Sequence, residues 1–140
     1  EKDIRKIIEV NVLQPIIITN KLINEYFFQK PKFIFISSSR ALKGDKGIVL
    51  YSTSKNAIRS FSKNLAMEYG NYNITSKVVN LGLFDGGLKN KLSKNSNNQI
   101  LDRTFNKKYV NVSQFIKTIE FTIEDDSGNG SEIFCDNGYV

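Results

Sequence analysis

The chain has 140 residues, 40% of them hydrophobic and 11% aromatic, which is enough for one buried core but too short for two comfortable domains. Its net charge is +6, but twenty basic residues are scattered among fourteen acidic ones, so a nucleic-acid partner is not expected. The chain has no histidine and one cysteine, Cys135, which excludes an internal disulfide, a His-dependent triad and zinc sites built on Cys and His, and we predict no metal.

The first half of the chain alternates between helical and strand patterns. Apolar residues recur at helical spacing from Asp3 to Phe28, which predicts a long helix interrupted by Pro15. Because this helix is already under way at the first residue, Glu1, we expect the chain to be a piece of a longer protein. The short apolar run KFIFIS, residues 32–37, predicts a buried parallel strand, and a polar loop follows it.

The second half continues the alternation. It contains a predicted helix at about 49–69, a strand at 74–81, a helix at about 112–124, and a strand with its tail at 131–140. Gly70 is expected to end the first of these helices. Residues 87–111 are polar and weakly patterned, which favours a mobile surface segment over a packed element. The order predicts one α/β domain, residues 1–140, in which about three parallel strands are covered by three major helices.

A Tyr-x-x-x-Lys spacing occurs twice, at Tyr26 with Lys30 and at Tyr51 with Lys55. Only the second pair has a supporting context. Ser38 leaves the first predicted strand thirteen residues before Tyr51, and Tyr51 opens the helix that returns from that loop. Functional groups gather at the carboxyl ends of parallel strands, so we expect Ser38, Tyr51 and Lys55 to face one pocket.

These three residue types suit proton transfer at a carbonyl or alcohol oxygen. A phenol ordinarily has a pKa of about 10, and a cation within about 4–6 Å makes it a stronger acid. Lys55 is expected to be that cation for Tyr51, while Ser38 hydrogen-bonds the same substrate oxygen. No side chain supplies hydride, so the chemistry requires a nicotinamide cofactor.

Asn11 adds a fourth candidate. Pro15 lacks the N–H that would have bonded the main-chain oxygen of Asn11, four residues earlier. The oxygen so released is able to hold a water that carries protons towards Lys55.

In this order, Asn11 in NVLQP, Ser38 in ISSS, Tyr51 and Lys55 in YSTSK, the NLG that follows the next strand, and SEIFCDNGY resemble the C-terminal half of a short-chain dehydrogenase/reductase. The resemblance is to the compact type, similar to 3-oxoacyl-ACP reductases. It implies a doubly wound Rossmann-like parallel sheet, NAD or NADP as cofactor, and a small carbonyl or alcohol substrate. It also implies that Tyr51 is the acid/base, Ser38 positions the carbonyl, Lys55 binds the nicotinamide ribose, and Asn11 holds a relay water.

The sequence departs from the family pattern in three places. The glycine-rich nucleotide fingerprint is absent, Leu81 precedes Gly82 where the family has proline, and Gly86 stands where a threonine would touch the cofactor phosphate. We nevertheless expect Gly82 to allow close approach of the nicotinamide and Phe84 to lie beside it. The segment 87–111 corresponds to the family's substrate lid.

We therefore predict an NAD(P)-dependent oxidoreductase that is inactive as these residues alone and forms a homo-oligomer when complete. The alternative is a non-catalytic remnant or binding module with the same fold. Four other polar positions receive non-catalytic interpretations: Ser37 and Ser39 as loop-capping hydroxyls, Asp85 as a turn residue, and Cys135 as inert core. No apolar run approaches a membrane span and no signal peptide is seen, so a cytoplasmic protein without a membrane partner is expected.

Overall fold

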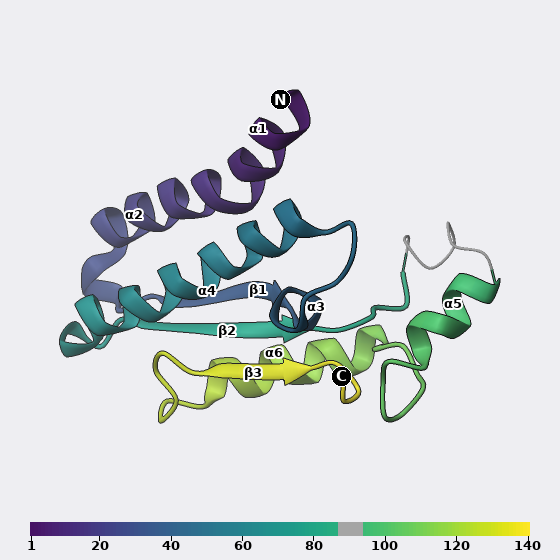
Figure 1. Ribbon diagram of the computed structural model, residues 1–140. Coiled ribbons are helices and arrows are strands. Elements are labelled where there is room, and N and C mark those ends of the chain that lie inside the picture. The colour runs from purple at the N-terminus through teal and green to yellow at the C-terminus, as the bar shows by residue number, and fades with distance from the viewer. Residues whose placement is uncertain (87–93) are drawn as a thin grey trace.

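The computed structural model describes residues 1–86 and 94–140, apart from the side chains of residues 94–97 (Figure 1). In chain order its elements are α1 (Lys2–Ile8), the π-helix η1 (Glu9–Leu13), α2 (Gln14–Tyr26), the 3₁₀ helix η2 (Phe27–Gln29), β1 (Lys32–Ser38), α3 (Ser39–Lys43), α4 (Val49–Tyr69), the 3₁₀ helix η3 (Gly70–Tyr72), β2 (Thr75–Leu81), α5 (Lys94–Leu101), α6 (Val112–Glu124) and β3 (Glu132–Cys135). The predicted alternation of helices and strands is confirmed.

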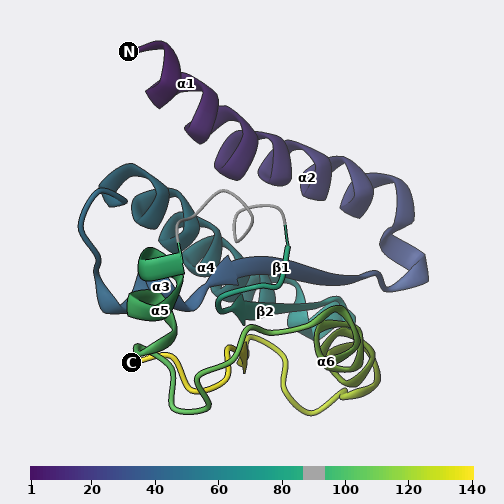
Figure 2. The ribbon, with the colours of Figure 1, turned by 90° about the vertical axis from the view of Figure 1, so that its right-hand side faces the viewer.

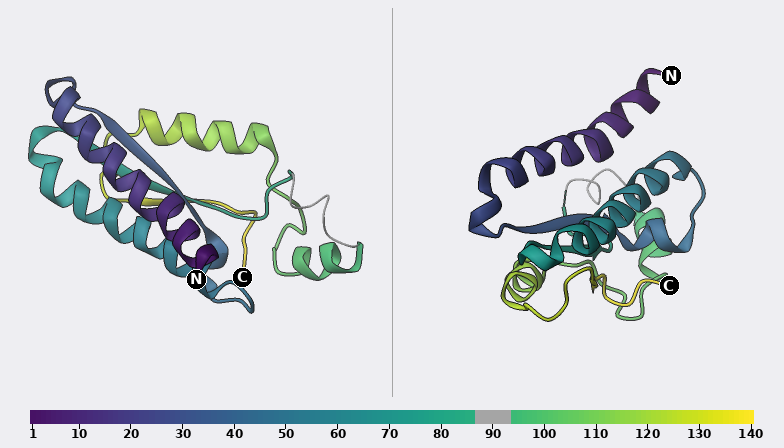
Figure 3. Two further views of the ribbon diagram at one scale, coloured as in Figure 1. Left: turned by 90° about the horizontal axis from the view of Figure 1, so that it is seen from above. Right: turned by 90° about the vertical axis from the view of Figure 1, so that its left-hand side faces the viewer.

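The three strands form one parallel sheet in the order β1-β2-β3. Ile36 of β1 lies opposite Val79 of β2, which lies opposite Ile133 of β3. Helix α4, with the α1–α2 helix against it, covers one face, and α6 covers the other (Figures 1, 2 and 3). Within the described residues β1 and β3 are the edge strands. The α/β class and the parallel sheet are confirmed.

Both faces of the sheet are buried because the strand side chains alternate between two cores. The core under α2 and α4 contains Ile23, Phe35, Ile58, Leu65, Ile74 and Val78. The core under α6 contains Val79, Val110 and Cys135, packed by Ile34, Ile36, Leu81, Phe84, Phe115 and Ile119. Cys135 is therefore core, as predicted, and complete burial of a side chain such as Val79 stabilises the fold by roughly 1.5–3 kcal/mol.

The long N-terminal helix changes its hydrogen-bond pattern close to the predicted interruption. Residues Glu9–Leu13 form a π-helix, in which the Gln14 N–H bonds back five residues to the Glu9 carbonyl. Pro15 is the second residue of α2, in the first turn of this α-helix, where its missing N–H costs less than in a helix interior. The proline is thus accommodated by a local widening of the helix before it.

Helix α4 ends at Tyr69 with Gly70 as its C-cap, as predicted. Gly70 keeps right-handed helical torsion angles, and the left-handed residue that turns the chain is Asn73, with φ 60°, after η3. In the segment 87–111, expected as a mobile surface segment, α5 forms a helix while Thr104 and Val110 are buried. Apolar periodicity is weak there because the helix is short and polar; residues 87–93 lie outside the described residues.

Helix α6 is fixed at both ends by side chains. Asn111 and Gln114 form a reciprocal capping box at its start, an arrangement that typically contributes about 1 kcal/mol. At its end, the buried ammonium of Lys77 in β2 donates to the carbonyls of Thr122 and Asp125 and to the Asp125 carboxylate at 2.8 Å. These bonds, with further bonds from Ser127, hold the pKa of Asp125 at about 2.

We expect Asp125→Asn to remove an acid-sensitive part of the stability. The folded-state pKa of Asp125 lies below its ordinary value, so its contribution is complete above about pH 4 and is lost as the pH falls towards 2. The free energy of unfolding, measured by urea titration across this range, should fall less steeply with acid in the variant. Asp126→Asn, which removes the neighbouring exposed carboxylate, is the control, and an equal change in both variants would contradict this role.

The carboxyl ends of the three strands meet at Asp136, directly after β3. Its carboxylate accepts the Ser39 hydroxyl from the end of β1 at 2.7 Å and the Gly138 N–H at 3.0 Å. The Gly82 N–H, after β2, donates to the Cys135 carbonyl at 2.9 Å. A Cβ on Gly82 would lie 2.5 Å from the Cα of Asp136, so only glycine fits there.

Gly82→Ala should therefore lower the free energy of unfolding by roughly 1–3 kcal/mol, because the methyl group meets backbone atoms that cannot move aside cheaply. Denaturant unfolding measures the loss. Gly70→Ala is the matched control, since Gly70 is helical and the nearest atom to its added methyl is the end of the Asn129 side chain, 3.2 Å away. Equal stability of the two variants would show that the contact at Gly82 is not restrictive.

Candidate active site

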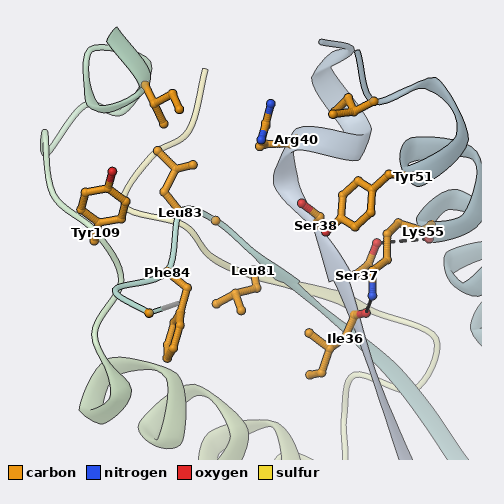
Figure 4. A pocket seen from close by; sticks show the side chains of 14 residues that line it. Ile36, Ser37, Ser38, Arg40, Tyr51, Lys55, Leu81, Leu83, Phe84 and Tyr109 are labelled. Atoms are coloured by element: carbon orange, nitrogen blue, oxygen red, sulfur yellow. Dashed lines mark hydrogen bonds between the residues drawn. The ribbon is translucent and has the colours of Figure 1, made fainter. Parts of the chain in front are cut away.

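A pocket of about 670 Å³ opens at the carboxyl ends of β1 and β2. The described residues that line it are Ile36, Ser37, Ser38, Arg40, Ile48, Tyr51, Lys55, Leu81, Gly82, Leu83, Phe84, Gly86, Ile100 and Tyr109 (Figure 4). Five of the six predicted site residues are among them. This is the edge at which parallel α/β sheets bind ligands.

Tyr51 and Lys55 lie one turn apart on α4, near the start of the helix. The Lys55 ammonium is 5.9 Å from the centre of the Tyr51 ring. The second pair with this spacing does not share a helical face, because Lys30 lies beyond the end of its helix with φ 53°. The structure thus separates the two pairs, and only Tyr51 and Lys55 line the pocket.

Strand β1 forms hydrogen bonds with both the side chain and the main chain of Lys55. The Lys55 ammonium donates to the Ile36 carbonyl at 3.0 Å, while the Ser37 hydroxyl donates to the Lys55 main-chain oxygen at 3.2 Å. Burial lowers the pKa of Lys55 from its ordinary value, because a charged ammonium loses hydration there. The side chain is therefore oriented towards the pocket and is easier to deprotonate than an exposed lysine.

Ser38 is the last residue of β1, is 6% exposed and lines the pocket next to Tyr51 (Figure 4). Its neighbours were expected to cap the loop, but they make long-range bonds instead. Ser37 bonds α4 through the Lys55 carbonyl, and Ser39 bonds Asp136. The three consecutive serines therefore have three different surroundings, and only Ser38 lies beside the phenol.

Asn11 does not line the pocket. Its side-chain amide donates to the Ser54 hydroxyl at 3.0 Å, and Ser54, which is fully buried, donates to the Tyr51 main-chain oxygen at 2.7 Å. Asn11 thus joins the π-helix to the first turn of α4, directly behind Tyr51. Hydrophobic periodicity around Ser54 does not predict this bridge, because the bridge joins two segments more than forty residues apart.

Gly82 and Phe84 both line the pocket on the β2 side. The need for glycine at position 82 is explained within the protein by the contact with Asp136. Phe84 is held by a bridge to Val110 and by an edge-on contact with Phe115, with ring centres 6.0 Å apart. The aromatic wall of the pocket is thus supported by α6.

Sequence reasoning missed Arg40 and Tyr109, which also line the pocket. A charged residue two positions after Ser38 was a usable signal for Arg40, whereas nothing local distinguishes Tyr109. Among residues 1–86 and 94–140, no cluster of three or more His, Cys, Asp or Glu side chains is arranged to hold a metal ion. Over the same residues, no helix has the length and apolar character needed to cross a membrane.

Comparison with known proteins extends these observations. The chain is 26% identical, over 145 aligned residues, to an L-xylulose reductase of Caenorhabditis elegans; the match covers 99% of this chain and 58% of the relative. Among solved structures, a 4-hydroxyisoleucine dehydrogenase complexed with NADH matches with a TM-score of 0.92 and 22% identity, over 100% of this chain and 60% of that one.

A gluconate 5-dehydrogenase from Burkholderia cenocepacia J2315, in complex with NADP and tartrate, matches with a TM-score of 0.91 and 20% identity, over 98% of this chain and 56% of that one. The chain thus spans about three fifths of the length of these relatives. The cofactors bound in these structures are those that the resemblance predicts, and the Rossmann-like fold is confirmed. The model of the short chain dehydrogenase family matches residues 1–97, and the chain belongs to that family.

Proposed function

We propose that the protein, when complete, is an NAD(P)-dependent oxidoreductase that interconverts a small carbonyl compound and its alcohol. The observation that carries this proposal is the convergence of Ser38, Tyr51 and Lys55 in one pocket at the carboxyl edge of the sheet. The family match and the reductase and dehydrogenase relatives support the same reaction class.

The pocket fits the reactive end of a nicotinamide cofactor. Lys55 and the Tyr51 hydroxyl offer donors for ribose hydroxyls, and Gly82 and Phe84 form a wall beside which a flat ring can lie. When bound, NAD or NADP supplies or accepts the hydride. The chain contains no glycine-rich phosphate turn, so these 140 residues by themselves are expected to bind cofactor weakly and to be inactive.

Tyr51 is the proposed acid and base. In reduction its hydroxyl gives a proton to the carbonyl oxygen, and in oxidation it takes that proton back. Ser38 donates a hydrogen bond to the same oxygen as negative charge develops there. The ammonium of Lys55, 5.9 Å from the phenol ring, stabilises the phenolate that remains after the proton leaves.

Asn11 has two proposed contributions. Its main-chain oxygen holds a relay water, as the sequence suggests, and its side chain positions Tyr51 through Ser54. The second contribution rests on hydrogen bonds at 3.0 and 2.7 Å that join the π-helix to α4. The π-helix itself supports a specialised role, because such widened turns are frequent at functional sites.

Association into a homo-oligomer is proposed for the complete protein. Apolar side chains lie exposed along the N-terminal helix, among them Ile4, Val10, Leu13, Ile17 and Ile18. Exposed apolar rows of this kind favour contact with another surface.

A cytoplasmic location remains a prediction from the sequence. A non-catalytic binding module with the same fold is the alternative function, and turnover by the full-length protein distinguishes the two.

Tyr51→Phe should lower kcat of the full-length protein by about 10²- to 10⁴-fold, because the proton donor is lost while the ring remains. The measurement is oxidation of NADH and NADPH with a panel of ketones. Tyr26→Phe is the matched control, since Tyr26 has the same sequence spacing to a lysine but does not line the pocket. Turnover that survives Tyr51→Phe would exclude the proposed acid, and no turnover by the unmodified protein would favour the binding module.

Lys55→Met should also lower kcat, by about 10²-fold or more, because the phenolate loses its neighbouring cation. The unmodified protein should lose activity in alkali as Lys55 loses its proton, at a lower pH than an exposed lysine would. The measurement is the pH profile of kcat for both proteins. Lys63→Met removes an exposed lysine from the same helix and should change neither kcat nor the pH at which activity is lost. Equal pH profiles for the unmodified protein and both variants would contradict the role of Lys55.

A further inference from the structure

The pocket contains a second cation that the proposed reaction does not use. Of the described residues that line it, only Arg40 and Lys55 are charged, and none is acidic. Lys55 is bound to the Ile36 carbonyl. In the view of Figure 4, Ser38 lies between Arg40 and Lys55, and apolar side chains form much of the remaining wall. An anionic group in this pocket would therefore meet an arginine and no opposing carboxylate among these residues.

Arg40 is held in place by Asp45 without being neutralised completely. Asp45 accepts hydrogen bonds from the Arg40 Nε at 3.0 Å and from its Nη2, and it forms an ion pair with the Arg103 Nη1 at 3.0 Å. Two guanidinium groups thus share one carboxylate, which leaves one net positive charge. The hydrogen bond from Arg40 is the main reason why the pKa of Asp45 lies below its ordinary value, so the carboxylate stays ionised and the arrangement persists.

The ordinary interpretation is a structural ion pair that ties α3 to the loop after it. Three observations extend it. A guanidinium has five N–H donors, so the pairing with Asp45 and the hydrogen bond with Tyr139 do not exhaust Arg40. The side chain is 24% exposed and lines the pocket, so a ligand can reach it. One residue separates Arg40 from Ser38, so their Cα atoms lie no more than about 7 Å apart, and one small molecule can contact both side chains.

We propose that the substrate is a small oxo acid or hydroxy acid whose carboxylate is bound by Arg40 while its carbonyl or hydroxyl oxygen faces Ser38 and Tyr51. This substrate class rests on the proposed function. In reduction, hydride forms the new C–H bond, the carbonyl π pair moves to oxygen, and that oxygen takes the proton of Tyr51. The carboxylate is unchanged by the reaction. Planar, two-pronged recognition of carboxylates is what arginine does better than lysine.

Binding calorimetry on the full-length protein tests the carboxylate site separately from turnover. The probes are 4-oxopentanoate and its neutral amide, 4-oxopentanamide, each with NAD⁺ or NADP⁺ present. We expect the acid to bind about 10- to 100-fold more tightly than the amide, and Arg40→Gln to abolish this difference. Arg40→Lys, which keeps the charge and guards against loss of folding, should retain part of it. Lys43→Gln, which removes an exposed charge from the same helix, should leave it intact.

Equal affinity of the unmodified protein for acid and amide would overturn the proposal, and so would a preference for the acid that survives Arg40→Gln. A phosphate of the cofactor is the competing anion for Arg40. Weaker binding of NAD⁺ or NADP⁺ by Arg40→Gln, with acid binding unchanged, would assign Arg40 to that phosphate and overturn the proposal. A preference for the acid that depends on Arg40, without any turnover of ketones or oxo acids, would sustain the carboxylate site and refute the proposed oxidoreductase.

Discussion

The pocket depends on the junction at which Asp136 ties the carboxyl ends of the three strands together. Its carboxylate holds the Ser39 hydroxyl at 2.7 Å, and its backbone fills the space beside Gly82. A parallel sheet positions its strands by slanted main-chain bonds, but the residues beyond the last bond are free to diverge. Asp136 prevents this divergence, so Ser38 and the β2 side of the pocket keep a fixed separation.

Strand β1 and helix α4 form the side of the pocket that carries Ser38, Tyr51 and Lys55, and they do so as one unit. The strand provides the carbonyl that receives the Lys55 ammonium and the Ser37 hydroxyl that holds the Lys55 main chain. It also ends in Ser38, and Asn11 supports the same helix from behind through Ser54. A buried lysine is costly unless it is bonded, and the carbonyl of Ile36 offsets part of that cost while it directs the charge towards the phenol.

Much of the fold was predictable because its signals are local. Apolar runs and helical periodicity located all three strands and the main helices, and the spacing from Ser38 to Tyr51 and Lys55 identified the core of the candidate site. The rest depends on pairs that are distant in sequence. The Ser39–Asp136 bond joins residues 97 positions apart, and the type of either residue does not predict which residue it will bond. The π-helix and the helix α5 were missed because hydrogen-bond shifts and short polar helices leave little trace in hydrophobic periodicity.

The edge position of β1 has a mechanical consequence. Within the described residues this strand pairs with β2 alone, so the main-chain groups on its other side are available to a further strand. The same strand carries Ser38 and the carbonyl that orients Lys55. Any segment that pairs with this edge is therefore bonded directly to the strand that positions Ser38 and Lys55, the groups proposed for proton transfer. A shift in that pairing would move these two groups without touching the pocket wall.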